Sequence, residues 1–142
     1  MILFDANILR YAENTDVPQH AKAVQWWDEQ LSTQPAIRLP WPVLSAFIRI
    51  STNHRAFRSP LMIGQAADRV SSWLERPNVQ TLETTPRHWT LFRQMLEGGQ
   101  ATGNLVSDAH LAALAIEHNC ELFSSDADFA RFPKLKWQNP LR

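Results

Sequence analysis

The sequence is poor in several features that mark large classes of protein. Cys120 is its only cysteine, so no intramolecular disulfide can form, and a cytoplasmic setting is the simpler expectation. Only four glycines and no low-complexity tract leave little room for a flexible linker between domains. No apolar run approaches the ~20 residues of a membrane-spanning helix, and the first residues do not resemble a signal peptide. We therefore expect an intracellular protein with no membrane partner.

The chain also has no excess of charge of either sign. It contains 14 basic and 14 acidic residues, so no global field draws it to nucleic acid, and any such contact must use a local patch. Hydrophobic residues make up 44% and charged residues 20%, as in a compact globular protein. A chain of 142 residues is large enough to bury its own core, and we expect a single domain over residues 1–142.

Strand and helix signals alternate along the chain. Short apolar runs predict strands at 2–4, 36–39, 79–82, 122–124 and 134–137. Apolar positions with helical spacing predict helices at 7–12, 20–31, 42–51, 61–74, 86–96 and 103–119, with a polar, basic loop at 53–60. This alternation predicts a three-layer α/β/α domain with a central parallel sheet.

Four aspartates stand at or near the ends of these predicted elements. Asp5 follows the first strand, Asp126 and Asp128 follow the strand at 122–124, and Asp108 lies in the helix at 103–119. Because parallel strands end at one common edge, acids from both ends of the sequence could meet there. Crowded carboxylates resist ionisation unless a cation neutralises them. The pattern therefore favours an oxygen-preferring ion such as Mg²⁺ or Mn²⁺.

The same acids have an ordinary structural alternative. Asp5 is well placed to cap a helix that follows the first strand, and Asp126 could cap a helix through Phe129 and Phe132. Asp108 is harder to explain as a cap, because it lies at the margin of an apolar helix face, where an unpaired carboxylate is costly. Asn104, four residues earlier, points the same way on that helix.

Three segments resemble the motifs of PIN domains. FDANIL at 4–9 resembles their opening motif, DAHLAALA at 108–115 their central acidic helix, and LFSSDADF at 122–129 their late strand and acidic turn. ARFPKL at 130–135 is similar to the tail of VapC-type toxins. The resemblance spans nearly the whole chain, and it implies a PIN-like parallel sheet with helices on both sides.

What the resemblance implies for function is a VapC-like toxin endoribonuclease that hydrolyses RNA phosphodiester bonds with Mg²⁺ or Mn²⁺. Its expected catalytic residues are Asp5, Asp108, Asp126 and Asp128. The first three would hold the principal ion, and Asp128 would bind a second ion or orient its water. The family also implies a homodimer and a small VapB-like antitoxin, a segment of which occupies the active-site groove.

Two further sets of residues are expected to assist the acids. Carboxylates are best oriented by neutral polar groups, and Asn7, Asn104 and Ser124 are the candidates. Phosphate contacts need cations, and the densest basic cluster is Arg49, Arg55 and Arg58. The alternative for this cluster is a solvated loop, with Arg49 paired to an acid of the site.

One position departs from the family pattern. Members usually carry a glutamate three residues before an arginine in the second conserved helix, and here Ala46 stands there, three residues before Arg49. This favours, as an alternative, a catalytically weakened PIN-like module that binds RNA or a protein partner. A third alternative is a structural α/β interaction domain in which the acids serve only as helix caps. A haloacid-dehalogenase-like phosphatase is disfavoured, because Asn7 replaces its second aspartate.

Overall fold

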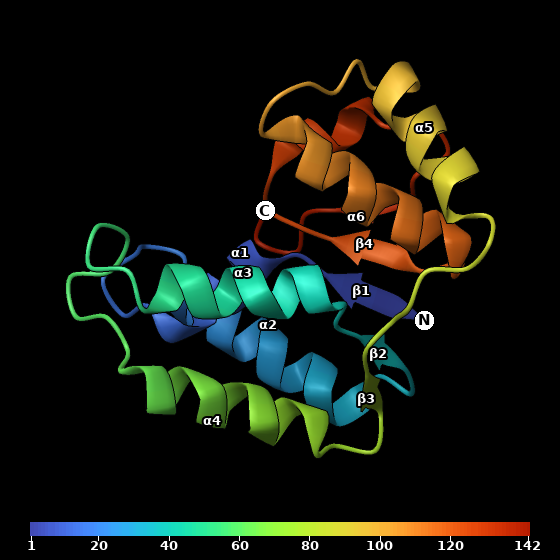
Figure 1. Cartoon of the computed structure of the whole chain (residues 1–142). Coiled ribbons are helices and arrows are strands. Elements are labelled where there is room, and N and C mark those ends of the chain that lie inside the picture. The colour runs from blue at the N-terminus through green and yellow to red at the C-terminus, as the bar shows by residue number, and fades with distance from the viewer.

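The computed structural model describes residues 1–142 as a five-stranded sheet with helices on both sides (Figure 1). The strands are β1 (Ile2–Phe4), β2 (Ile37–Arg38), β3 (Val79–Gln80), β4 (Glu121–Phe123) and β5 (Trp137–Gln138). The helices are α1 (Ala6–Glu13), α2 (His20–Thr33), α3 (Trp41–Ser51), α4 (Ile63–Leu74), α5 (His88–Gly98) and α6 (Leu105–Glu117), with a 3-10 helix at Ala127–Arg131. The predicted α/β class and the alternation of elements are confirmed.

The sheet changes direction next to its first strand. The strand order is β3-β2-β1-β4-β5, and β1 pairs in parallel with both β2 and β4. The chain therefore moves outward from β1 through β2 to β3 and then crosses back to β4. In Figure 1, α5 and α6 lie together on one side of the sheet, and α1 to α4 gather on the other. Open parallel sheets bind ligands at such a reversal, beyond the carboxyl ends of the strands.

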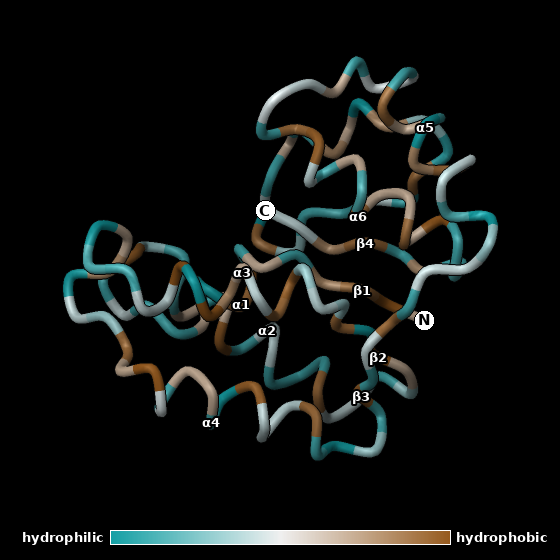
Figure 2. The backbone as a smooth tube through the Cα atoms, viewed as in Figure 1, coloured by the Kyte–Doolittle hydropathy of each residue, from teal (hydrophilic) through white to brown (hydrophobic).

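β1 is fixed in the centre of the core. Its three residues are buried, as expected of a strand that is covered on both faces. Figure 2 shows that this strand is hydrophobic. The ring of Phe4 meets Trp27 of α2 edge-on at a centroid distance of 4.8 Å, and Trp27 meets Trp73 of α4 in the same way at 5.7 Å. Such aromatic pairs stabilise a core beyond the area that they bury. None of the helices has the length and apolarity that a bilayer crossing requires.

Local sequence signals set where the functional elements start. Asp5 caps α1 through its side chain, and Pro42 lies in the first turn of α3, where proline is favoured. Gly103, with a φ of 58°, allows the left-handed turn that leads into α6. Strands β2, β3 and β5 are shorter than predicted, β1 has its predicted bounds, and β4 begins and ends one residue earlier. The last one begins at Trp137 rather than at Lys134, whose φ of 65° is incompatible with an extended strand.

Candidate active site

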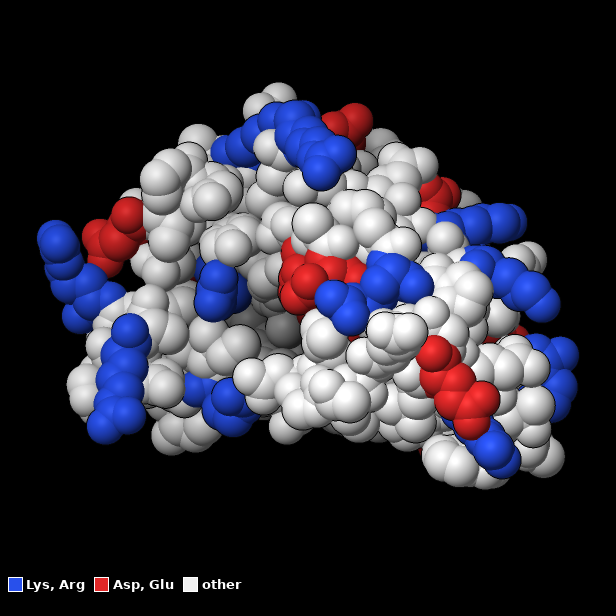
Figure 3. All heavy atoms as spheres, turned by 90° about the horizontal axis from the view of Figure 1, so that it is seen from above, with Lys and Arg blue, Asp and Glu red and all other residues white.

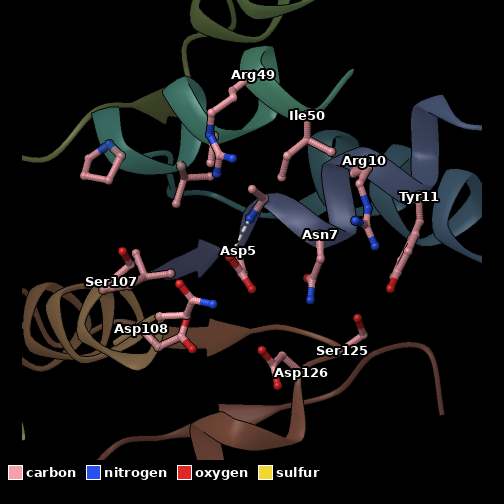
Figure 4. Close-up of a pocket in the computed structure, with 16 residues that line it drawn as sticks. Asp5, Asn7, Arg10, Tyr11, Arg49, Ile50, Ser107, Asp108, Ser125 and Asp126 are labelled. Carbon is pink, nitrogen blue, oxygen red and sulfur yellow. Dashed lines mark hydrogen bonds between the residues drawn. The ribbon is translucent and has the colours of Figure 1, made fainter. Parts of the chain in front are cut away.

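A cavity of about 640 Å³ opens at the carboxyl ends of β1 and β4 (Figure 4). Its walls come from α1, α3, the start of α6 and the segment that follows β4. Three of the four predicted acids line it, namely Asp5, Asp108 and Asp126. Its size is typical of sites for small ligands or for part of a larger one. The predicted convergence of the acids at one sheet edge is thus found in the structure.

Ser124 lies between the two ends of the chain at the base of this cavity. Its side chain is fully buried, and its hydroxyl donates a hydrogen bond to Oδ2 of Asp5 at 2.9 Å. The Ser124 hydroxyl oxygen also accepts hydrogen bonds from the backbone N–H of Asp126 at 3.0 Å and from the Asn7 amide at 3.3 Å. One hydroxyl can donate once and accept twice, so its hydrogen-bonding capacity is filled. Ser124 and Asn7 are therefore placed to orient Asp5, while Asn104 lines the cavity wall.

Two of the acids cap helices as well. Oδ1 of Asp5 accepts from the N–H of Ala6 at 2.7 Å, and Oδ1 of Asp126 accepts from the N–H of Asp128 at 2.9 Å. The caps fix the orientation of both carboxylates. Each cap uses one carboxylate oxygen, so the other oxygen can still take part in the site. A role as a helix cap and a role in the site are therefore compatible for both residues. For Asp126 that oxygen is free of protein hydrogen bonds, whereas for Asp5 it is bonded to Ser124.

The tightest group of acids contains three of the four predicted catalytic residues. Asp108, Asp126 and Asp128 each offer a carboxylate oxygen, and these oxygens lie within 4.8 Å of one another. Asp5 lines the same cavity but stands outside this group. The side chain of Asp128 is 52% exposed and lies 3.7 Å from Arg131. Three converging carboxylates fit an oxygen-coordinated divalent cation, whose ligands stand within about 2.0–2.6 Å of the ion.

The electrostatics of the cavity reflect this crowding. Partial burial, followed by the charges of Asp5, Asp126 and Asp128, raises the pKa of Asp108 to about 7. Burial also raises the pKa of Asp5, although the hydrogen bonds from Ser124 and Ala6 oppose the shift. Both shifts show that negative charge is disfavoured in the absence of a cation. A bound divalent cation would remove that penalty and keep both carboxylates ionised.

Ala46 lies in the wall of the cavity, on the face of α3 that points to the acids. A carboxylate at this position would therefore face the site, and the alanine leaves that place without a ligand. Its neighbour Ser45 is exposed and does not line the cavity. Glu13, a conceivable substitute, instead forms an ion pair with Arg69 of α4 at 3.1 Å. No glutamate lines the cavity.

The three predicted arginines are separated in space. Arg49 lies on α3 and lines the cavity, yet it forms no ion pair with any acid. Arg55 and Arg58 are exposed on the segment between α3 and α4, outside the cavity wall. Figure 3 shows acidic side chains gathered at the edge of a hollow, with basic side chains standing around it.

Several lining residues were missed by the sequence reasoning. Arg10 and Tyr11 of α1 line the cavity, as do Ser107 and Ser125. A signal for the first two exists, because Asn7, Arg10 and Tyr11 have the i, i+3, i+4 spacing of one helix face. Once Asn7 is assigned to the site, the same face carries the other two along the cavity (Figure 4).

Known proteins resemble this chain over its full length. The family model of the PIN domain matches residues 2–135. Ribonuclease VapC33 of Mycobacterium tuberculosis (strain CDC 1551 / Oshkosh) is 42% identical over 142 residues, covering 100% of this chain and 99% of the relative. The structure of VapBC2 from Rickettsia felis, bound to a DNA fragment from its promoter, has a TM-score of 0.69 at 20% identity and covers 98% of each chain. That of VapC20 from Mycobacterium tuberculosis, a sarcin-ricin loop cleaving toxin, has a TM-score of 0.66 at 17% identity, covering 96% and 99%. The structural likenesses bear on the fold alone.

Proposed function

Because the chain belongs to the PIN domain family, we propose that it is a VapC-type toxin that hydrolyses RNA phosphodiester bonds as a metal-dependent endoribonuclease. The observation that carries this proposal is the convergence of Asp108, Asp126 and Asp128 at the reversal point of the sheet. Its support includes the VapC33 relative, a ribonuclease that shares 42% of its residues with this chain.

The proposed cofactor is Mg²⁺ or Mn²⁺. Asp108, Asp126 and Asp128 would hold it, since their oxygens can reach one ion. When bound, such an ion supplies charge neutralisation at the phosphate and makes a water molecule more acidic. Both effects serve phosphodiester hydrolysis, in which an activated water attacks phosphorus and an oxygen leaves.

The other residues of the cavity orient the acids and the substrate. Asp5 lies beside the three-acid group, fixed by Ala6 on one oxygen and by Ser124 on the other, so that it rotates little when a substrate enters. Asn7 and Ser124 orient it without adding charge. Arg49, on the opposite wall, is placed to neutralise phosphate charge.

The proposed partners are RNA, a VapB-like antitoxin and a second copy of the chain. The antitoxin is proposed from the VapC relatives, of which VapC33 is 42% identical to this chain over 142 residues. Large exposed apolar side chains support protein contacts. Trp41 on α3 is 55% exposed, and Trp89 on α5 is 61% exposed. The proposed location of the protein and of these partners is the cytoplasm.

The experiment is an RNA cleavage assay with purified, antitoxin-free protein in Mn²⁺, in Mg²⁺ and with a chelator. The test variant is Asp5→Asn, which keeps the α1 cap because asparagine caps a helix as well as aspartate does. We expect cleavage by the wild type that needs metal, and its loss in a folded Asp5→Asn protein. Equal cleavage by the variant, or cleavage in chelator, would contradict the proposal.

Ala46 favours a second candidate, a binding module that has lost catalysis. The cavity wall has no glutamate, so one carboxylate that the family usually contributes is missing. Tight RNA binding without metal-dependent cleavage would support this candidate. The three converging carboxylates favour the enzyme. Their mutual repulsion, seen in the raised pKa of Asp108, is an electrostatic cost that only a bound cation would offset.

A further inference from the structure

The wall of the cavity opposite the acids carries two cationic side chains that have no anionic partner. Arg10 of α1 and Arg49 of α3 both line the cavity. Neither forms an ion pair, and neither guanidinium donates a hydrogen bond to a protein group, although acids line the same cavity. Three arginines elsewhere in the chain do have such a partner. Arg69, Arg93 and Arg131 each have a carboxylate within 4.0 Å.

Arg10 is held in place by its neighbour. Its guanidinium carbon lies 4.7 Å from the ring centroid of Tyr11, over the ring. Tyr11 itself is partly buried and packs against the hydrophobic core. A cation over an aromatic ring is attracted by the ring's quadrupole and loses less freedom when it binds a ligand. The guanidinium therefore presents its donors to the cavity while its position is set by Tyr11 (Figure 4).

The position of Arg10 differs from that of the acids. It lies five residues beyond Asp5, or about 7 Å along the axis of α1 at 1.5 Å per residue. Arg49 likewise lies one turn beyond Ala46 on α3. Both arginines thus lie further along the cavity than the carboxylates, against which the phosphodiester bond would be cut. A guanidinium suits a phosphate there because its planar fork can donate two hydrogen bonds.

We propose that Arg10 and Arg49 form a phosphate subsite for the nucleotide that flanks the cut bond, with Tyr11 as the positioning residue of Arg10. This inference rests on the proposed function, since it takes single-stranded RNA as the ligand. On one face of α1, Asn7 would then orient Asp5, and Arg10, one turn further along, would bind the phosphate of the substrate. The subsite holds the chain in register, so that one phosphodiester lies against the carboxylates.

The test is the salt dependence of RNA binding. A short fluorescein-labelled single-stranded RNA is titrated by anisotropy in Mn²⁺ at several salt concentrations, with Asp5→Asn in every protein to prevent cleavage. Removal of one phosphate contact makes the slope of log K against log salt shallower by about 0.7. We expect this change in Arg10→Ala. Arg93→Ala is the matched control, because it removes the same charge from an exposed pair on α5 outside the cavity.

Tyr11 is tested through its dependence on Arg10. Tyr11→Leu should weaken RNA binding in the presence of Arg10 and have no further effect in the Arg10→Ala protein, because contacts that act as a unit are not additive. Tyr11→Phe keeps the ring and should restore binding. Since Tyr11 packs against the core, melting curves of each variant establish that it is folded.

The outcomes separate this inference from the proposed function. Equal slopes for Arg10→Ala and Arg93→Ala, or no RNA binding at low salt, would overturn the subsite, even if the wild type cleaves RNA. A shallower slope in Arg10→Ala alone supports it. If the wild type binds RNA in this way but never cuts it, the subsite stands and the ribonuclease proposal fails.

Discussion

The hydroxyl of Ser124 donates a hydrogen bond to Asp5 at 2.9 Å across 119 residues of sequence. It joins the residue that follows β1 to the residue that follows β4, at the point where the sheet reverses direction. The backbone at Ser124 is fixed as well, since its N–H donates to Gln138 and its carbonyl accepts from the Trp137 indole. The geometry of the site therefore depends on one buried hydroxyl.

The first prediction concerns that hydroxyl. Ser124→Ala leaves the N–H of Asp126 without its acceptor and frees one oxygen of Asp5. Loss of an orienting contact next to a metal site lowers metal affinity or activity by about 10–100-fold. We expect a cleavage rate reduced by about that factor, with the protein still folded. Ser71→Ala, the same change on the exposed surface of α4, should cleave at the wild-type rate. Equal rates for the two variants would contradict the role of Ser124.

The second prediction concerns pH and the metal-free protein. Folding raises the pKa of Asp108 from 3.8 to about 7, so the folded state binds a proton more tightly than the unfolded state. The contribution of Asp108 to stability is therefore present at low pH and is lost as pH rises through this window. In chelator, Asp108→Asn should melt progressively higher than the wild type as pH rises from about 5 to about 8.

Metal reverses this difference. A divalent cation binds the ionised form, so added Mn²⁺ should raise the melting temperature of the wild type more at the higher pH, with little effect on Asp108→Asn. A difference between the two proteins that does not change with pH would contradict the raised pKa.

The third prediction concerns the position of the missing glutamate. Ala46→Glu brings a carboxylate into the cavity wall, next to the acids. An additional anionic ligand should raise Mn²⁺ affinity by about tenfold, measured by calorimetric titration. It should also destabilise the metal-free protein at neutral pH, because like charges repel. Ser45→Glu adds the same charge outside the cavity and should change neither quantity. An affinity that is equal in the two variants would show that position 46 does not face the ion.

The fourth prediction concerns a buried hydrogen-bonded pair, Glu117 and His88, that joins α6 to α5 away from the cavity. Glu117 has no side-chain exposure, and it accepts hydrogen bonds from Thr85 and from His88 at 3.0 Å. His88 in turn contacts His110 at 3.0 Å. Truncation of Glu117 to alanine leaves these groups unpaired and should lower the free energy of unfolding by about 2 kcal/mol. Glu97→Ala removes the exposed partner of Arg93 and should cost less than about 0.5 kcal/mol in denaturant unfolding.

The same pair has a pH signature. Burial alone would raise the pKa of Glu117, but the hydrogen bonds from Thr85 and His88 outweigh it and lower the pKa below 4.5. Its stabilisation is therefore present above that value and is lost as pH falls through the lower, folded-state pKa. Acid unfolding of Glu117→Ala should be shifted less by pH below about 4.5 than that of the wild type. Parallel curves would contradict the lowered pKa of Glu117.

The part of the site that sequence predicts is the part that topology controls. A carboxylate after a buried strand must lie at the carboxyl edge of a parallel sheet, so Asp5 and Asp126 meet whenever their strands are neighbours. The N-caps were equally predictable, because Asp before a helix is a strong local signal. The class of fold followed from the alternation of strands and helices.

What sequence did not predict depends on side-chain directions. Asp128, in the 3-10 helix at Ala127–Arg131, belongs to the closest group of acids, whereas both oxygens of Asp5 accept hydrogen bonds. Which of the four acids hold the ion stays a prediction. Arg10 and Tyr11 share a face of α1 with Asn7, but their residue types alone do not distinguish them from ordinary surface residues. The strand ends were also missed, since a positive φ such as that of Lys134 has no clear signal in the residue itself.

The most direct test of the account is the cleavage rate of RNA as a function of Mn²⁺ concentration, for the wild type, for Asp108→Asn and for Asp68→Asn. Asp68 is an exposed acid of α4, so its variant removes the same charge outside the site. The account predicts saturable, metal-dependent cleavage that is equal in the wild type and Asp68→Asn and is abolished in Asp108→Asn. Cleavage by folded Asp108→Asn with the Mn²⁺ dependence of the wild type would contradict it.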